Sequence, residues 1–215
     1  MGVSRETLIS AYFPARSKEV ERYAEILATW GIDRGLIGPK EGDRIWDRHI
    51  ANSLPIISLL PEGSSLLDIG SGAGLPGIVI ALARPDLRVT LLEPLQRRID
   101  FLEEVVAELG VDITVRRGRA ESFKGSFSNV TARAVAPLPK LATLAWHLVA
   151  PGGSLLAFKG EGAAGELAEA EKEAPKVFKK VAKSQVHEIT LDLLDLLDSP
   201  ANLPLTRIVQ LKKAG

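Results

Sequence analysis

The pattern of apolar and polar positions divides the chain into a helical beginning and a longer part that mixes strands with helices. Ser4–Phe13 and Lys18–Trp30 carry apolar residues at helical spacing, which predicts two helices. A third helix is expected over Asp47–Leu60, although Pro55 in its interior cannot donate a backbone hydrogen bond. We therefore expect an N-terminal helical extension over residues 1–60.

From residue 61 onward, short apolar runs alternate with helical patterns, which predicts a mostly parallel sheet with right-handed crossovers. The predicted strands are Leu66–Ile69, Arg88–Leu92, Asp112–Arg116, Val130–Ala134, Ser154–Phe158, Phe178–Ile189 and Leu205–Lys212. The predicted helices are Gly77–Ala83, Gln96–Leu109, Pro139–Leu148 (ended by Ala150-Pro151-Gly152-Gly153) and Ala163–Glu173. The last two strands are expected to pair antiparallel at one edge, joined by a loop around residues 199–202. Residues 61–215 should thus form one α/β domain of about seven strands.

A glycine-rich turn follows the first predicted strand. The segment Leu66–Gly77 reads LLDIGSGAGLPG, in which Gly70, Gly72 and Gly74 lead from a strand into a helix. Glycine has no Cβ, so the backbone can approach a ligand closely and adopt angles that other residues avoid. Glu93 ends the next predicted strand, where a carboxylate can accept both hydroxyls of an adenosine ribose. This combination predicts an adenosine-containing ligand.

The same turn also fits the G-x-G-x-x-G fingerprint of dinucleotide-binding proteins, so a nicotinamide cofactor is an alternative. Three features favour S-adenosylmethionine. Asp68 can hold the ammonium of a methionine moiety but would repel a pyrophosphate. Pro76 removes a backbone N–H that could bind phosphate. The segment Leu148–Phe158, LVAPGGSLLAF, resembles the helix-to-strand segment before the fifth strand of many class I methyltransferases.

Two further positions fit the adenosine end of such a cofactor. Ala120 and Glu121 follow the third predicted strand, where these folds place a backbone N–H and an acid near the adenine ring. The alternative for Glu121 is a solvated carboxylate at a helix start. Arg133 ends the fourth predicted strand in an apolar context, and burying a lone guanidinium is costly. A site role or an ion pair is therefore expected for Arg133.

The amino-acid composition excludes several classes of site and of protein. The 215 residues are 46% hydrophobic and 25% charged, which is enough for a folded core. The chain has no cysteine, which excludes disulfides, thiolate metal sites and a cysteine nucleophile. Its three histidines show no metal-ligand spacing, and no apolar run is long enough to span a membrane. The formal net charge is zero, which argues against a general polyanion binder but permits a local basic face. We expect a soluble cytoplasmic protein without a metal.

Two features that the sequence lacks reduce the range of possible methyl acceptors. The run that follows the fourth predicted strand, residues 133–138, does not match the N/D-P-P-Y/F motif of amino-group methyltransferases. The absence of cysteine excludes covalent catalysis at pyrimidine C5. What remains is an acceptor that is already nucleophilic, such as a ring nitrogen. Such a reaction needs alignment and no general base.

Several segments together resemble the bacterial 16S rRNA guanine-N7 methyltransferase G family, also called the glucose-inhibited division protein B family. These segments are DIGSGAGLPGI at 68–78, L-L-E-x4-R-x2-F-L at 91–102, RAE at 119–121, RAVAPL at 133–138, FKG at 158–160 and RHIANSL at 48–54. The resemblance covers about residues 4–211. Asn52 replaces the usual aspartate and Ala132 a common serine, which puts in doubt any role of those two side chains.

The resemblance implies a class I S-adenosylmethionine-dependent methyltransferase with a Rossmann-like sheet. Its substrate would be N7 of one guanine in 16S rRNA near the decoding site, so the partner would be 16S rRNA or the small ribosomal subunit. By matching positions, the donor pocket would be lined by Gly70, Leu75, Ala120, Glu121 and Arg133, and the reasoning from the residues adds Asp68, Gly72, Gly74 and Glu93. We expect the enzyme to be a monomer.

RNA binding needs cations over phosphates and often a planar group against an unstacked base. Arg133 and Lys159 lie at predicted strand ends beside the donor site and are expected to position the substrate. The predicted RNA contacts are Arg48, His49, Arg97, Arg98, Lys159 and Arg207. Three other functions stay open: a methyltransferase of a small metabolite, a nicotinamide-dependent oxidoreductase, and a module that senses S-adenosylmethionine without catalysis.

Overall fold

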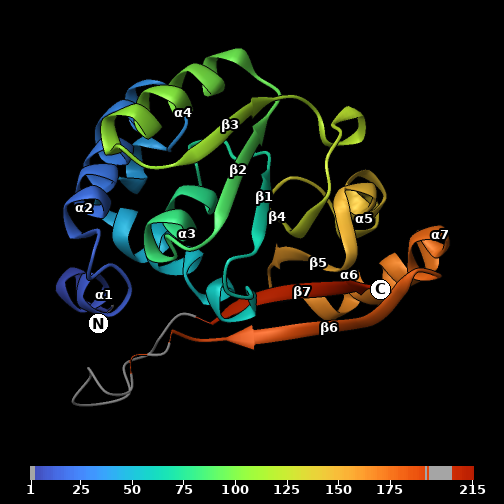
Figure 1. The fold of residues 1–215 in the computed structure, drawn as a ribbon. Coiled ribbons are helices and arrows are strands. Elements are labelled where there is room, and N and C mark those ends of the chain that lie inside the picture. The colour runs from blue at the N-terminus through green and yellow to red at the C-terminus, as the bar shows by residue number, and fades with distance from the viewer. Residues whose placement is uncertain (1–2, 192, 194–204) are drawn as a thin grey trace.

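A seven-stranded sheet forms the centre of the protein, and its strands lie in the order β3-β2-β1-β4-β5-β7-β6 (Figure 1). The structure, a computed structural model of the chain, describes residues 3–191, 193 and 205–215. The strands are β1 Ser65–Ile69, β2 Arg88–Glu93, β3 Ile113–Arg117, β4 Phe127–Arg133, β5 Val149–Lys159, β6 Val181–Ile189 and β7 Thr206–Lys213. The first five strands pair parallel, and β7 pairs antiparallel with both β5 and β6. The predicted antiparallel edge is therefore confirmed.

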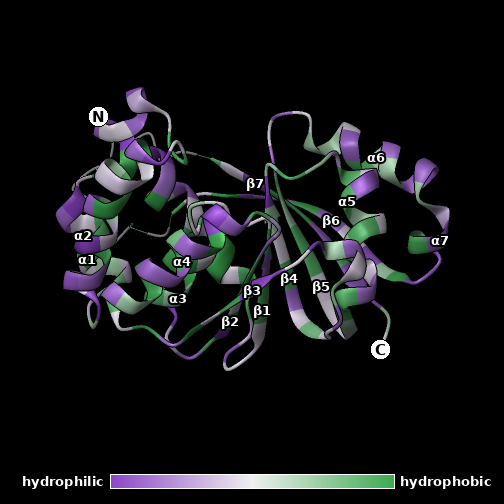
Figure 2. Cartoon of the chain, turned by 90° about the horizontal axis from the view of Figure 1, so that it is seen from above, coloured by the Kyte–Doolittle hydropathy of each residue, from purple (hydrophilic) through white to green (hydrophobic). Residues whose placement is uncertain are grey.

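Helices cover both faces of the sheet, as Figure 2 shows from above. They are α1 Arg5–Tyr12, α2 Ser17–Ile26, α3 Gly77–Ala83, α4 Gln96–Leu109, α5 Leu138–Ala145, α6 Ala163–Glu173 and α7 Pro175–Phe178. The first four helices pack in one hydrophobic cluster, and α5, α6 and α7 pack in a second cluster on the other face. Within the described residues, no helix is long and apolar enough to cross a membrane.

The extension begins with two helices, as the sequence predicts, but its third part differs. Ser4 caps α1, because its hydroxyl accepts a hydrogen bond from the backbone N–H of Thr7. The single helix expected over Asp47–Leu60 is wrong. This stretch instead forms a π-helical turn, Ile45–Ile50, and two 3₁₀ turns, Ala51–Ser53 and Pro55–Leu59. A π-helical turn, Leu27–Gly31, and a 3₁₀ turn, Pro39–Arg44, precede it. Pro55 explains the break before the last turn, since it has no N–H to continue a helix.

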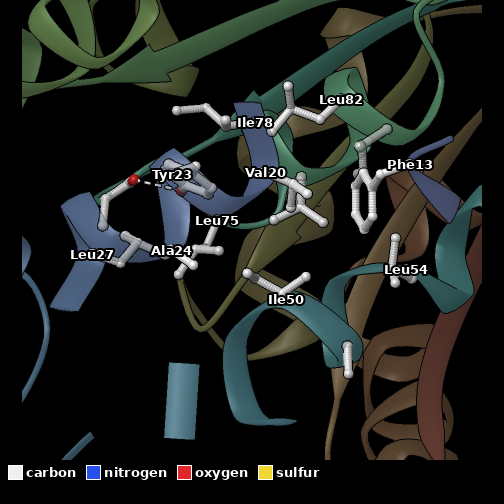
Figure 3. Packing of buried hydrophobic residues seen from close by; sticks show 14 of the residues in the cluster. Phe13, Val20, Tyr23, Ala24, Leu27, Ile50, Leu54, Leu75, Ile78 and Leu82 are labelled. Atoms are coloured by element: carbon white, nitrogen blue, oxygen red, sulfur yellow. Dashed lines mark hydrogen bonds between the residues drawn. The ribbon is translucent and has the colours of Figure 1, made fainter. Parts of the chain in front are cut away.

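The extension shares its core with the sheet domain. Phe13, Val20 and Leu27 from the extension belong to the same buried cluster as Ile78 and Leu82 of α3, and Figure 3 shows these side chains packed together. The phenyl ring of Phe13 is only 1% exposed. The extension therefore stabilises the α3 face of the sheet and cannot be detached without uncovering that face.

All seven strands differ from their predicted ranges at one or both ends, mostly by one to three residues, and Phe178, predicted to begin a strand, ends the helix α7. β5 begins at Val149, so the turn residues 150–153 lie within a strand that has an irregular register opposite β4. β4 ends at Arg133, because Ala134 has a φ of 56°, outside the extended region. The expected loop around residues 199–202 lies outside the described residues. Two short 3₁₀ turns, Ala120–Ser122 and Trp146–Leu148, complete the described elements.

The shared core leads to a prediction about stability. Replacing Phe13 with alanine removes a fully buried ring between the extension and α3, so the free energy of unfolding should fall by about 3–5 kcal/mol. Urea denaturation followed by tryptophan fluorescence measures this change. Leu95→Ala is the control, because Leu95 is 45% exposed and its loss leaves no cavity. A loss below about 1 kcal/mol for Phe13→Ala would show that the extension does not contribute to the core.

Candidate active site

The turn from β1 into α3 lies at the carboxyl edge of the sheet, beside the point where the connections from β1 and β4 diverge to opposite faces. Such a switch point is where open α/β sheets bind ligands. Gly70, Gly72 and Gly74 have φ values of 67°, 57° and 93°, which glycine adopts without strain. A Cβ on Gly70 would lie 2.8 Å from Cγ2 of Val135. The glycine is therefore needed for close packing of the loop after β4.

Glu93 holds the glycine turn from the end of β2. Its side chain is 1% exposed, and Oε2 accepts a hydrogen bond of 3.1 Å from the backbone N–H of Gly72. The other oxygen, Oε1, accepts from the N–H of Leu95 at 3.1 Å, and Arg98 Nη1 lies 3.6 Å from Oε2. The carboxylate predicted to bind a ribose is thus already fixed in orientation by the backbone around it.

Asp68 lies under the same turn and is fully buried. Its Oδ2 accepts a hydrogen bond of 3.0 Å from the N–H of Gly77 at the start of α3. Its Oδ1 has no hydrogen-bond partner among the described residues. Burial raises the pKa of Asp68 to about 7, against the opposing effect of the Gly77 hydrogen bond. An unsatisfied buried acceptor next to the glycine turn is suited to a cationic donor such as an ammonium group.

Tyr23 of α2 holds the turn from the side of the extension. Its ring is fully buried, and its hydroxyl donates a 2.8 Å hydrogen bond to the carbonyl of Ala73. Figure 3 shows Tyr23 among the apolar side chains of α2 and α3. Burial raises the pKa of Tyr23 well above its usual value, so the hydroxyl stays protonated and remains a donor. The sequence gives no sign of this bond, since Tyr23 fits the apolar face of a helix.

A first cavity of about 260 Å³ opens beside the glycine turn. Its lining is mainly apolar and includes Gly70 and Leu92 at strand ends, Ala120 and Glu121 from the turn after β3, and Val135. Glu121 and Arg119, 4.0 Å apart, are the charged pair at its rim. An apolar slot with a few polar groups at its edge is suited to a planar heterocycle such as adenine.

A second cavity, of about 660 Å³, opens on the other side of the loop after β4. It is lined by polar and charged side chains from the extension, β4, β5, α6 and β7, namely Glu41, Arg48, His49, Asn52, Arg133, Lys159, Glu166, Thr206 and Arg207. Ala134 lines this second cavity, whereas Val135 and Ala136 line the first. The two cavities therefore flank one short segment.

Arg133 joins the end of β4 to the extension. Its Nη1 donates a 3.1 Å hydrogen bond to Ser53 Oγ, and its Nη2 lies 3.1 Å from His49 Nδ1. Burial lowers the pKa of this guanidinium, yet arginine stays charged and can only donate. His49 Nδ1 must then be the acceptor, so the imidazole is neutral with its proton on Nε2. Burial and the nearby Arg133 charge lower the pKa of His49, which agrees with this assignment.

Glu41 completes a row of polar groups that begins at Arg133. Its Oε1 accepts a 3.0 Å hydrogen bond from Arg48 Nη1, and its Oε2 lies 3.3 Å from His49 Nε2. The geometry at His49 Nε2 does not make a hydrogen bond, so this buried N–H has no partner among the described residues. Sequence reasoning missed Glu41, which stands in a charged surface segment without a motif.

Lys159 is turned inward. Its side chain is 9% exposed, and Nζ lies 2.7 Å from Glu166 Oε2 and donates a 2.9 Å hydrogen bond to the Ala136 carbonyl. Glu166 Oε2 also accepts from the N–H of Leu138 at 3.0 Å. The ion pair thus holds the C-terminal end of the segment that separates the two cavities, through Ala136 and Leu138. The sequence interpretation of Lys159 as an RNA contact did not foresee this internal pairing.

The other predicted residues are divided between the second cavity, the surface and the glycine turn itself. Arg48, His49 and Arg207 line the second cavity, with Arg207 paired to Glu188 at 2.7 Å. Arg97 and Arg98, at the start of α4, line neither cavity. The predicted donor residues Leu75, Gly72 and Gly74 also line neither one; they belong to the turn and its packing.

A family model described as rRNA small subunit methyltransferase G matches residues 16–193. A protein named ribosomal RNA small subunit methyltransferase G from Acidothermus cellulolyticus is 56% identical over 149 residues, which are 69% of this chain and 67% of that protein. One of the same name from Kineococcus radiotolerans is 51% identical over 166 residues, 75% of this chain and 65% of that protein. The chain thus spans about two thirds of the length of these relatives.

Solved structures show the fold. A methyltransferase from Pyrococcus furiosus has a TM-score of 0.56 at 15% identity and covers 77% of this chain and 83% of its own. An S-adenosylmethionine-dependent O-methyltransferase from Thermotoga maritima has a TM-score of 0.56 at 17% identity, over 81% of this chain and 71% of its own. This likeness confirms the predicted class I methyltransferase fold. At such low sequence identities it supports no conclusion beyond the fold.

The hydrogen bond from Tyr23 leads to a prediction about cofactor binding. In Tyr23→Phe the carbonyl of Ala73 loses its donor in a buried site and the glycine turn is held less firmly. The dissociation constant for S-adenosylmethionine should rise about three- to tenfold, as expected for one such bond. Isothermal titration calorimetry measures it. Thr29→Ala is the control, because the Thr29 hydroxyl binds only the Glu25 carbonyl on the exposed side. Equal affinities for Tyr23→Phe and wild type would contradict this role of Tyr23.

The raised pKa of Asp68 leads to a prediction about pH. A ligand ammonium beside Oδ1 favours the ionised carboxylate, so the carboxyl must lose its proton when the cofactor binds below about pH 7. Affinity for S-adenosylmethionine should therefore rise with pH up to about 7, by at most about tenfold per pH unit, and stop rising above it; it should fall above about pH 8, where the ligand ammonium loses its own proton. Calorimetry from pH 5.5 to 8.5 tests this. Asp68→Asn should bind more weakly and without that slope, and an unchanged slope in the variant would assign the titration to another group.

Proposed function

The chain belongs to the rRNA small subunit methyltransferase G family, and on this premise we propose that it transfers a methyl group from S-adenosylmethionine to N7 of one guanine in 16S rRNA near the decoding site. The observation that carries the proposal is the pair of cavities on the two sides of Ala134–Ala136. One is apolar and adjoins the glycine turn. The other is polar and cationic, and it is open enough to admit a nucleotide.

The residues beside the first cavity fit the methyl donor. Glu93 is orientated by backbone N–H groups to accept the ribose hydroxyls, and Asp68 offers an unsatisfied oxygen to the ammonium. Ala120 and Glu121 line the slot for the adenine ring. When bound, S-adenosylmethionine supplies an electrophilic methyl group on a sulfonium. The chain's own contribution is to hold that group still and to exclude competing nucleophiles.

The second cavity fits the acceptor. N7 of guanine carries a free lone pair, so the reaction needs alignment and no proton transfer at the attacking atom. The side chains agree with this, because the neutral His49 already accepts a hydrogen bond from Arg133. We assign Arg133 to positioning the acceptor beside the donor, and Arg48 and Arg207 to the RNA phosphates. Lys159 acts through the segment that it fixes and does not contact RNA directly.

Family membership disfavours the alternative of a small-metabolite substrate, and the methyltransferase neighbours in structure disfavour a nicotinamide cofactor. A module that only senses the cofactor would have no use for the large second cavity. We extend the proposal to a monomer that needs no metal for the reaction. Among the described residues, no cluster of histidines and carboxylates is arranged to hold a metal ion.

The proposal predicts methylation of small ribosomal subunits taken from a bacterial strain without this activity. Labelled methyl should enter 16S rRNA, and borohydride–aniline treatment should cleave the chain at one guanine. Arg133→Ala should reduce kcat/KM by about a hundredfold or more, because it removes the group that aligns the acceptor. Arg88→Ala is the matched control, because Arg88 begins β2, away from the carboxyl edge of the sheet, and lines neither cavity. Transfer of label to metabolite extracts but not to subunits would contradict the proposal.

A further inference from the structure

The row of polar groups from Arg133 to Glu41 presents an unused hydrogen-bonding pattern to the second cavity. The Nε2–H of His49 is buried, has no hydrogen bond among the described residues and lies 3.3 Å from Glu41 Oε2, so it reaches a base in the cavity after a small rotation of the imidazole ring. Glu41 offers two carboxylate oxygens, and its side chain is 23% exposed. Arg48 holds this carboxylate through a hydrogen bond to Oε1, and each oxygen keeps a lone pair for a further donor. The protein thus places one donor beside two acceptors.

We propose that Glu41, together with the Nε2–H of His49, binds the Watson–Crick edge of the target guanine and selects this base. The inference rests on the proposed function and names the residues that recognise its acceptor. The Watson–Crick edge of guanine presents O6 as an acceptor, then N1–H and the 2-amino group as donors. The His49 and Glu41 groups match this order: Nε2–H donates to O6, and the carboxylate accepts from N1–H and from the amino group.

The direction of attack supports this orientation. N7 must point at the donor methyl, and the donor site adjoins the ends of β1 and β4. Along the Watson–Crick edge, O6 is next to N7, and N1–H and the 2-amino group lie progressively farther from it, so these two donors must lie away from those strand ends. Arg133 is at the end of β4, His49 contacts it, and Glu41 lies beyond His49 on the extension. Glu41 is therefore on the side of the cavity that this edge must face.

Glu41 is also the carboxylate that remains available. The described lining of the second cavity contains two carboxylates, Glu41 and Glu166. Glu166 Oε2 already binds Lys159 Nζ and the N–H of Leu138, and it lies beside the segment that separates the cavities. Glu166 would therefore face the N7 side of the base. Among the described residues, the Glu41 carboxylate has polar contacts only with side chains of the extension, so it can accept new donors without releasing the loop.

The charge changes during methyl transfer make this carboxylate useful for the reaction itself. The N7–methyl bond forms as the methyl–sulfur bond breaks, the electron pair of the broken bond stays on sulfur, and the positive charge moves to the purine. A cationic purine has more acidic N1–H and amino groups, so their hydrogen bonds to Glu41 become stronger in the transition state. An interaction that strengthens in this way raises kcat as well as binding.

The same contact explains selection against other bases. Adenine has an acceptor at N1 and no 2-amino group, so it would place a lone pair against the Glu41 carboxylate and offer it no donor. A site that is built for a donor rejects an analogue that lacks the donor more strongly than a site built on shape alone. Cytosine and uracil likewise present a different order of donors and acceptors. The carboxylate therefore distinguishes guanine by chemistry and not only by the fold of the RNA.

The test combines a variant with a base analogue. Small subunits are assembled with 16S rRNA ligated from a transcript and a synthetic segment, which carries either guanosine or inosine at the position that wild-type enzyme methylates. Inosine lacks only the 2-amino group. Wild-type kcat should fall about tenfold with inosine, the loss expected for one good base contact. On the guanosine substrate, kcat of Glu41→Gln should be about tenfold or more below that of wild type. On the inosine substrate, kcat of Glu41→Gln should be less than about threefold below that of wild type, because the amide oxygen can still accept from N1–H.

Asp43→Asn is the matched control, since Asp43 is exposed on the same 3₁₀ turn and the change removes the same charge. Its rates on both substrates should equal those of wild type. Equal losses for Glu41→Gln on guanosine and inosine would mean that Glu41 only supports Arg48 and His49, and would overturn the inference. Wild-type rates that do not distinguish the two substrates would overturn it without any variant. Absence of methylation of the guanosine substrate by wild type would refute the proposed function instead.

Discussion

The turn from β1 into α3 leaves backbone groups without partners in any helix or strand, and side chains from three other elements satisfy them. Tyr23 of α2 donates to the Ala73 carbonyl, Glu93 of β2 accepts from the Gly72 N–H, and Asp68 of β1 accepts from the Gly77 N–H. Each bond is buried or partly buried, so its loss would leave an unsatisfied polar group at a cost of about 1–3 kcal/mol. The donor site depends on this shared support.

A second buried polar group ties the acceptor side to the same framework. Arg133 could not be buried at the end of β4 without partners, and both of its partners, Ser53 and His49, come from the extension. The extension therefore supplies support to both cavities, through Tyr23 on one side and through Ser53 and His49 on the other. This double role explains why the extension packs into the main core, where Phe13 and Val20 meet α3.

The sequence alone was sufficient to predict the features that depend on hydrophobic periodicity and on the conformational freedom of glycine. The alternation of strands and helices, the antiparallel edge and the need for glycine at Gly70 follow from local pattern. Long-range partners did not follow from it: Tyr23 occupies an ordinary apolar helix position, and its carbonyl partner is 50 residues away. The inward turn of Lys159 depends on Glu166, which a helical pattern alone leaves on the surface. Pairings of this kind appear only when the tertiary fold brings the elements together.

The charges of the second cavity reconcile a neutral chain with an RNA substrate. Arg48 pairs with Glu41, Arg207 with Glu188 and Lys159 with Glu166, so these lining cations are already compensated. An arbitrary polyanion would have to displace these carboxylates and would gain little from the exchange. The RNA substrate gains more binding free energy, because its base can bind the Glu41 carboxylate in the cavity while an RNA phosphate pairs with Arg48. Internal pairing thus suppresses binding that depends on charge alone and leaves binding that depends on the base.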